Sequence, residues 1–465
     1  MKFIDRIEEQ HILHKALDNK ERKFIVVYGR RRLGKSTLIK RVLKENDVYY
    51  EAEKNEQAVQ MSLLAHTVNA SYPHFDAVQY LSWEGILMNF NLVCKENSTL
   101  VLDEFPFLVE KTPSLPSTLQ RLLDSGELRF NLIICGSSQR MMQKIVLDSS
   151  EPLYGRAHEK INLQPIRLKY WHKAMKWNAV NSIEEFSVWG GVPRYWALRE
   201  EYDDLTDAID HLILDEHGVL YDEPAALFMD DISEIAPYAS IMTALGNGNN
   251  RFSNVANAVG KKTTELSKPL NNLSNMRYIR KEVPFGENEK KTKKTIYRID
   301  DPFMSFYYRF IAPNKSLLSL GRKQIVLDTI HTEMPEHVSF IWERLCQIAV
   351  SGNTLFGHTW NVARRWWGKV PIFDEGKKTP IGYEDLEFDV VAEDFNNPST
   401  ILVGECKWKS ADYADRLLQQ LKTKTQKAPF SQGKKIVYVL FLKEHPLVSA
   451  DCSIMLPENV IDCLP

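Results

Sequence analysis

The chain has 465 residues, of which 44% are hydrophobic and 26% are charged, and its formal net charge is −2. This length predicts about three domains, and the composition is that of a globular protein rather than a disordered one. The absence of an apolar run of about 18 residues argues against a membrane span. The six cysteines form no CxxC pair and the chain starts with charged residues, so we expect a reduced, cytoplasmic protein without disulfides, a zinc ribbon or a signal peptide.

The first informative element is an apolar run at 24–28, followed by the letters GRRRLGKS at 29–36. This is the phosphate-loop pattern GxxxxGK[ST], in the expected context of a strand that leads into a helix. Gly29 and Gly34 let the backbone approach phosphates, Lys35 reaches the β/γ oxygens, and Ser36 holds Mg²⁺. Arg32 and Thr37, in and directly after this loop, are further candidates for binding the nucleotide. The sequence therefore predicts ATP·Mg²⁺ binding, against the alternative of an ordinary turn with an incidental lysine.

A second apolar run, at 99–104, ends in two acidic residues. In a parallel sheet, Asp103 would lie at the carboxyl end of a buried strand, on the same edge as the phosphate loop. We expect Asp103 to orient the Mg²⁺ shell and Glu104 to polarise the attacking water. The alternative is a turn that ends the strand.

A third run, at 130–138, ends in two serines. Ser137 is a candidate sensor of the γ-phosphate, but either Ser137 or Ser138 can instead cap the next helix, expected at 139–146. Arg156 follows a glycine turn and is a candidate for stabilising phosphoryl-transfer charge, against the alternative of a surface arginine. Arg140 and Arg156 are both candidates for acting on a neighbouring subunit, which leaves the monomer and the ring open.

Several short motifs resemble those of archaeal-type predicted ATPases in the signal-transduction (STAND) branch of the AAA+ superfamily. They occur in the family's order, at residues 3–10, 29–36, 49–52, 102–106, 134–138, 152–156 and 190–195. The resemblance implies a P-loop α/β core with a parallel sheet at 1–166. It also implies a helical lid and connector at 167–234.

The middle segment, 235–312, predicts a winged helix-turn-helix: helices near 239–245, 252–259 and 264–273, then strands at 278–281 and 295–299. Between Arg251 and Arg298 there are 12 Lys/Arg against 4 Asp/Glu, an excess of +8. This excess favours DNA, with the third helix in a major groove and the lysines of the wing on phosphates. The alternative is a module for protein partners or a spacer. The segment also resembles the one that follows the ATPase in the same family.

The last part, 325–465, predicts a second chemical site. Two strands, at 386–392 and 400–408, are joined by a turn at 396–398, so Asp389 and Glu405 would converge on one divalent cation. Lys407 lies on the same face as Glu405 and would align or deprotonate water, as phosphodiester hydrolysis requires. Glu343, on an upstream helix, is a further candidate metal ligand. A helix at 412–427 and a strand at 434–443 are expected downstream, and the alternative for the two strands is a surface hairpin of alternating charge.

This order of elements resembles the PD-(D/E)xK, restriction-endonuclease-like fold. The resemblance maps the metal and catalytic positions onto Asp389, Glu405 and Lys407, and less directly onto Glu343. Phe388 stands where the motif's name has proline. The segments 366–368 and 404–408 are similar to the nuclease-related domain that ends many archaeal-type ATPases. Mg²⁺, or Mn²⁺ in its place, is the implied metal.

The sequence thus predicts an ATPase that engages DNA through a winged helix and cleaves it with a nuclease-like domain. Two alternatives remain open: a nucleotide-dependent switch that binds DNA without cutting, and a protein-interaction scaffold with an inactive nuclease-like domain. The expected partners are ATP, DNA and proteins that dock on the winged helix. An oligomer is compatible with the sequence, and no membrane contact is expected.

Overall fold

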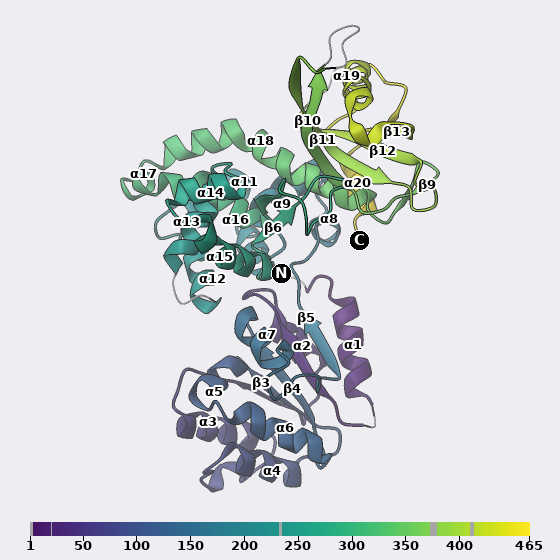
Figure 1. Cartoon of the computed structure of the whole chain (residues 1–465). Helices are drawn as coiled ribbons and strands as arrows, with labels where there is room; N and C mark the ends of the chain where they lie inside the picture. Colours follow the sequence, from purple (N-terminus) through teal and green to yellow (C-terminus); the bar gives the residue numbers. More distant parts are fainter. Residues whose placement is uncertain (1–2, 20, 232–234, 373–378, 410–412) are drawn as a thin grey trace. The chain divides into compact units, whose positions relative to one another are not determined.

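The computed structural model describes residues 3–19, 21–231, 235–372, 379–409 and 413–465. The chain divides into two compact units (Figure 1). The N-terminal unit comprises Met1–Ile166, Val192–Ala197 and Pro224–Ser233, and the C-terminal unit comprises Arg167–Gly191, Leu198–Glu223 and Glu234–Pro465. Each unit is described by itself.

The N-terminal unit is built on a five-stranded sheet in the order β2-β3-β4-β1-β5, in which every pair is parallel. Its strands are β1 (Phe24–Tyr28), β2 (Val48–Glu51), β3 (Thr99–Asp103), β4 (Asn131–Gly136) and β5 (Glu159–Asn162). Every residue of β1, β3 and β4 is buried, so both faces of the sheet are covered. The predicted parallel α/β core is therefore confirmed.

Helices surround this sheet (Figure 1). They are α1 (Ile7–Leu17), α2 (Lys35–Val42), α3 (Gln57–Asn69), η1 (Phe75–Ala77), α4 (Trp83–Val93), α5 (Phe105–Lys111), α6 (Leu115–Ser125) and α7 (Gln139–Leu147). Two later helices, α10 (Pro193–Arg199) and α12 (Glu223–Asp231), belong largely to this unit. Because the strands are parallel, the loops after β1, β3 and β4 leave the sheet at one edge, which positions the candidate nucleotide site.

The first part of the C-terminal unit is mostly helical and includes one antiparallel hairpin, β6–β7. Three helices, α13 to α15, precede that hairpin, and Leu266, Leu270 and Leu273 of α15 are buried on one face. The elements are α8 (Leu168–Met175), α9 (Ala179–Trp189), α11 (Leu205–Ile209), η2 (Asp210–Leu214), α13 (Ile235–Gly246), α14 (Phe252–Val259), α15 (Thr263–Asn275), β6 (Ile279–Glu282), β7 (Ile296–Ile299), α16 (Pro302–Phe306), η3 (Tyr307–Ile311), η4 (Ala312–Asn314) and α17 (Lys315–Ser319).

The rest of the C-terminal unit contains a mixed sheet in the order β10-β11-β12-β13-β14. The pairs β10–β11 and β11–β12 are antiparallel, and the pairs β12–β13 and β13–β14 are parallel. One face packs against α18 and α20, and the other packs against α19. The elements are α18 (Lys323–Val350), β8 (Thr354–Leu355), β9 (His358–Thr359), β10 (Arg364–Ile372), β11 (Gly382–Glu393), β12 (Thr400–Lys407), α19 (Ala414–Lys427), η5 (Pro429–Ser431), β13 (Lys435–Leu442), β14 (Ser453–Met455) and α20 (Pro457–Cys463).

Several of the elements expected from sequence appear close to their predicted bounds. Helix α14 spans the predicted 252–259, and β11 and β12 pair as the predicted hairpin. Two expected helical segments lie partly outside the described residues: the connector at 167–234 by its residues 232–234, and the helix at 412–427 by Asp412. All six cysteines are free, and within the described ranges no helix is long and apolar enough to cross a membrane.

One buried histidine makes the stability of the C-terminal unit depend on pH. His337 of α18 is 1% exposed, packs against Phe306 and Phe310, and lies 2.9 Å from the carbonyl oxygen of Ser187. Burial lowers its pKa from 6.5 to about 4. The unfolded chain therefore binds this proton first as the pH falls, and the folded state loses stability between pH 6.5 and about pH 4.

We expect His337→Gln to remove part of this pH dependence. Between about pH 7 and about pH 5, wild type should lose about 2 kcal/mol more free energy of unfolding than the variant, because one pKa unit corresponds to about 1.36 kcal/mol. Urea unfolding measures the difference. His217→Gln is the control, since the side chain of His217 is 90% exposed. Identical pH profiles for wild type and His337→Gln would contradict the assignment.

Candidate functional site

The loop between β1 and α2 has the backbone shape of a phosphate-binding loop. Gly34, which caps α2, has φ 85°, and Gly29 has φ 152°. A Cβ atom at Gly29 would lie 2.5 Å from the carbonyl oxygen of Leu163, so only glycine fits there without a shift. Arg32 also adopts positive φ, at 67°. The loop wraps over the start of α2, where free N–H groups favour anions.

The Lys35 side chain is buried inside this loop. Its Nζ donates to the carbonyl oxygens of Gly29 (2.8 Å) and Arg30 (3.0 Å). Only 5% of the residue is exposed, and burial lowers the pKa of its ammonium group. An ammonium group held by carbonyls in this way can exchange them for phosphate oxygens, with which it interacts more strongly.

Ser36 and Asp103 meet at the edge of the sheet. The Ser36 hydroxyl donates to Asp103 Oδ2 at 2.8 Å, and the Tyr49 hydroxyl donates to the same oxygen. Burial acts to raise the pKa of Asp103, but hydrogen bonds from Tyr49, Cys135, Ser36 and the Glu104 N–H lower it overall. The result is an ionised carboxylate beside a hydroxyl, a set of oxygen donors that fits Mg²⁺.

Glu104 and Ser137 form a second contact at the same edge. Glu104 adopts the left-handed conformation (φ 49°) at the start of α5. Ser137 donates to it twice, from its hydroxyl to Oε1 at 2.6 Å and from its N–H to Oε2 at 3.2 Å. Ser138 caps α7 by accepting from the N–H of Met141. The sequence left open which serine caps the helix. In the structure Ser138 is the cap of α7, and Ser137 contacts Glu104 instead.

The remaining nucleotide-site candidates are more exposed. Thr37 is exposed on α2, and Arg140 is exposed on α7. Arg156 donates through Nε and Nη2 to both carboxylate oxygens of Asp124, each at 2.8 Å. That Arg156 stabilises phosphoryl-transfer charge therefore stays a prediction. Arg156 would have to leave Asp124 to contact a nucleotide.

The second candidate site lies on β11 and β12. Val390 of β11 pairs with Gly404 of β12. Asp389 immediately precedes Val390 and Glu405 immediately follows Gly404, so the two carboxyl groups come from adjacent strands. Asp389 Oδ2 accepts the N–H of Cys406 at 2.8 Å. Glu405 is held by two lysines: Oε1 by Lys407 (2.6 Å) and Oε2 by Lys424 of α19 (2.8 Å).

The charges of this site are strongly coupled. Burial and the neighbouring Glu405 raise the pKa of Asp389. Burial opposes ionisation of Glu405 as well, but Lys407 and Lys424 lower its pKa overall. Burial also acts against the charged form of Lys407, yet Glu405 raises its pKa. Carboxylates whose pKa values are pushed apart are typical of sites for acid–base or metal chemistry.

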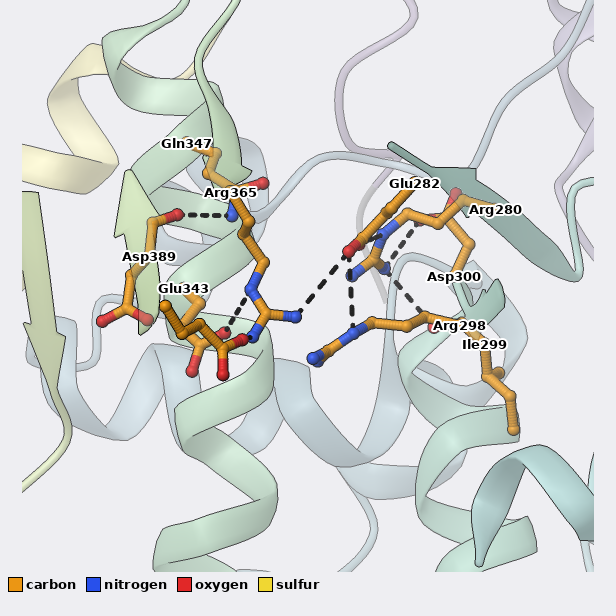
Figure 2. Close-up of polar contacts among 10 residues, drawn as sticks. Arg280, Glu282, Arg298, Ile299, Asp300, Glu343, Gln347, Arg365 and Asp389 are labelled. Atoms are coloured by element: carbon orange, nitrogen blue, oxygen red, sulfur yellow. Dashed lines mark hydrogen bonds and ion pairs between the residues drawn. The ribbon is translucent and has the colours of Figure 1, made fainter. Parts of the chain in front are cut away.

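Glu343 of α18 contacts this site through an ion-pair network (Figure 2). Burial and Asp389 raise the pKa of Glu343 to about 7. Its Oε2 lies 3.7 Å from Nε of Arg365, and Arg365 also pairs with Glu387 and, at 3.8 Å, with Glu282 of β6. On the same helix, Gln347 donates to the backbone oxygen of Asp389. The network links the β6–β7 hairpin to the carboxylates.

A cavity of about 1360 Å³ opens over these residues. Its lining includes Glu343, Asp389, Glu405 and Lys407, together with residues 292–298 of the hairpin region. Lys424 lines the cavity as well. In total the lining has nine basic and five acidic side chains, a net charge of +4. The cavity lies within the C-terminal unit.

The carboxylates of this cavity offer oxygen ligands of the kind that Mg²⁺ and Mn²⁺ prefer. Within the described ranges, however, no group of three or more His, Cys, Asp or Glu side chains is arranged to hold a metal ion. Asp389 and Glu405 come from adjacent strands, while Glu343 is paired with Arg365. Both oxygens of Glu405 are bound by lysines, so Glu405 would have to leave Lys407 or Lys424 before it could bind a metal, and Glu343 would have to leave Arg365.

Sequence reasoning missed three residues that the structure places at these sites. Tyr49 bonds Asp103, Lys424 bonds Glu405, and Arg365 joins Glu343 to the hairpin. Lys424 lies three positions after the buried Leu421, so the amphipathic pattern of α19 places it at the edge of the buried face. Nothing in the sequence separates the buried Arg365 from the exposed arginines around it.

Two segments of the chain match known protein families. Residues 3–188 match a family described as "ATPase domain predominantly from Archaea". Residues 307–424 match a family described as "Archaea bacterial proteins of unknown function". An uncharacterized protein of Methanocaldococcus jannaschii is 28% identical over 464 residues, which cover 97% of this chain and 98% of that protein.

Among solved structures, the chain is similar to the Aeropyrum pernix ORC2 protein, with 12% identity and a TM-score of 0.42 over 71% of this chain and 96% of that one. It is also similar to Cdc6p of Pyrobaculum aerophilum, with 13% identity and a TM-score of 0.33 over 69% and 97%. The ATPase predicted from the sequence is thus supported by the family match of residues 3–188.

Proposed function

We propose that this protein is an ATP-dependent enzyme that cleaves nucleic acid. The observation that carries the proposal is the convergence of Asp389, Glu405 and Lys407 on a cavity of net charge +4. Two carboxylates and a lysine are the groups that metal-assisted phosphodiester hydrolysis uses. A polyanionic substrate would be drawn into a cavity with this charge.

In the N-terminal unit, we assign ATP to the loop of Gly29, Arg32, Gly34, Lys35, Ser36 and Thr37. Lys35 would exchange loop carbonyls for β/γ-phosphate oxygens, and Ser36 and Asp103 would hold Mg²⁺. Glu104 would orient the attacking water, with Ser137 restraining its carboxylate until nucleotide binds. Mg²⁺ held by Ser36 and Asp103 would neutralise part of the phosphate charge.

In the C-terminal unit, Asp389 and Glu405 would hold Mg²⁺ or Mn²⁺, with Glu343 as a third ligand. A metal held by these residues would supply Lewis-acid chemistry, namely polarisation of a phosphoryl oxygen and a lower pKa of bound water. Lys407, whose Nζ lies 2.6 Å from Glu405 Oε1, would act as an ammonium group that orients the water or stabilises the negative charge of the phosphate, because its raised pKa keeps it protonated. Asp389 is kept in place by the Cys406 N–H and Gln347.

We assign the surrounding architecture as follows. Residues 1–166 are the ATPase core of AAA+ (STAND) type, 167–234 its helical lid and connector, 235–312 a winged helix, and 325–465 a PD-(D/E)xK-like domain. The winged helix would bring DNA to the cavity through its basic residues, and it also offers a surface to protein partners. The protein would act in the cytoplasm, as a monomer or an oligomer.

The test is cleavage of plasmid DNA with Mg²⁺ or Mn²⁺. Wild type is expected to nick or linearise the plasmid, and Lys407→Ala is expected to reduce the rate by about 100-fold or more, since it removes a group that acts on the reacting atoms. Lys409→Ala is the matched control, because Lys409 is exposed two residues further on. Equal rates for Lys407→Ala and Lys409→Ala would overturn the proposed site.

A second candidate is a nucleotide-dependent switch that binds DNA without cutting it. The observation in its favour is that both oxygens of Glu405 are already bound by Lys407 and Lys424. If neither metal supports cleavage by wild type while ATP is still hydrolysed, the switch replaces the nuclease.

A further inference from the structure

Two parts of the chain line the cavity of the C-terminal unit, and they differ in charge. The lining residues between 248 and 298 include five basic side chains and no acidic one. All five lining carboxylates belong instead to α18, β11 and β12. The segment 248–298 would therefore attract the phosphates of a nucleic acid, while the phosphodiester bond to be cut would lie near Asp389, Glu405 and Lys407.

Two arginines of the cavity lining, Arg298 and Arg365, are held only by long ion pairs at three of their donor nitrogens. Nε of Arg298, and Nε and Nη1 of Arg365, are buried and lack a hydrogen-bond partner among the described residues. Their nearest carboxylate oxygens, on Glu282 and Glu343, are 3.6–3.8 Å away. Figure 2 shows the two guanidinium groups pointing toward one another from β7 and β10. A phosphate group offers several acceptor oxygens and would compete with Glu282 and Glu343 for these donors, which form no hydrogen bond to either carboxylate.

Aromatic side chains lie beside these arginines in the lining. Phe340 of α18 is 36% exposed, and its ring lies 5.3 Å from the Arg298 guanidinium carbon. Trp367 of β10 is half-buried in the same cavity. Aromatic faces next to basic groups are the surface that binds unpaired bases by stacking, whereas bases in a duplex already stack on each other.

We propose that this cavity binds a single strand of nucleic acid, with one phosphate on Arg298 and Arg365 and bases against Phe340 and Trp367. The inference rests on the proposed nuclease function and specifies its substrate as unpaired rather than duplex. DNA and RNA share this chemistry, so both are tested.

The test is fluorescence anisotropy of labelled oligonucleotides of about 16 nucleotides, the upper end of single-strand site sizes. EDTA is present, so that binding is measured without cleavage. We expect wild type to bind single-stranded DNA or RNA at least about tenfold more tightly than the matching duplex. Phe340→Ala and Trp367→Ala should each weaken single-strand binding about tenfold, since stacking contributes roughly 1–3 kcal/mol per base.

Two controls keep the result interpretable. Tyr383→Ala removes an aromatic side chain that is 64% exposed on β11 and outside the cavity lining, and it should leave binding unchanged. Phe340→Trp should restore binding, because it keeps an aromatic face. We avoid Arg365 variants here because its buried ion pairs make it important for folding.

The outcomes separate this inference from the nuclease proposal. Equal affinity for single strand and duplex, with Phe340→Ala neutral, would overturn the inference even if plasmid is cut. Loss of single-strand binding in Phe340→Ala would support it even if no metal yields cleavage. Absence of measurable binding to every oligonucleotide would overturn it.

Discussion

Lys35→Ala is expected to lower the rate of ATP hydrolysis by about 100-fold or more, because it removes a preorganised charge from the phosphates in the transition state. The side chain is buried, and its Nζ donates to the loop carbonyl oxygens of Gly29 and Arg30. Phosphate release from purified protein measures the rate.

The same substitution should not destabilise the protein in the absence of nucleotide. Burial disfavours the charged form of Lys35, so its removal relieves a desolvation cost. Thermal unfolding without ATP, beside the exposed Lys15→Ala as a control, separates loss of chemistry from loss of folding. Unchanged ATP hydrolysis in Lys35→Ala would show that the loop is not the nucleotide site.

Arg365→Met is expected to lower the free energy of unfolding of the C-terminal unit by about 3–5 kcal/mol, because it leaves buried carboxylates without their partner. Arg365 has a side chain that is 8% exposed and pairs with Glu282, Glu343 and Glu387. Denaturant unfolding followed by tryptophan fluorescence measures the change.

The neighbouring residue provides a matched control. Arg364 precedes Arg365 on β10, its side chain is 37% exposed, and it pairs with Glu289, which is 61% exposed. An exposed pair contributes only about 0–1 kcal/mol, so Arg364→Met should change stability little. Similar losses in the two variants would show that the network in Figure 2 does not stabilise the unit.

Local patterns predicted the parts of both sites that lie on short, regular segments. The phosphate loop and the run ending at Asp103 were visible because strand and loop chemistry are local in sequence. The β11–β12 hairpin was equally visible because its two strands are separated by a short turn. The placement of Asp389 beside Glu405 followed from that pairing.

The remaining contacts depend on how distant segments pack. Lys424 reaches Glu405 from a helix, and Tyr49 reaches Asp103 from a neighbouring strand. Arg365 joins a hairpin about 80 residues earlier to α18 and β11, which no local period can encode. Burial of these charges is a property of the packed unit, so the raised pKa of Glu343 was not predictable from its sequence neighbours.

If this chain couples ATP to cleavage at the Asp389–Glu405–Lys407 site, its cleavage rate depends on nucleotide. The decisive measurement is the rate of nucleic-acid cleavage as a function of ATP concentration, for wild type and Lys35→Ala side by side. We expect ATP to raise the wild-type rate and Lys35→Ala to show no response to ATP. Cleavage by wild type at the same rate with and without ATP would contradict the coupling.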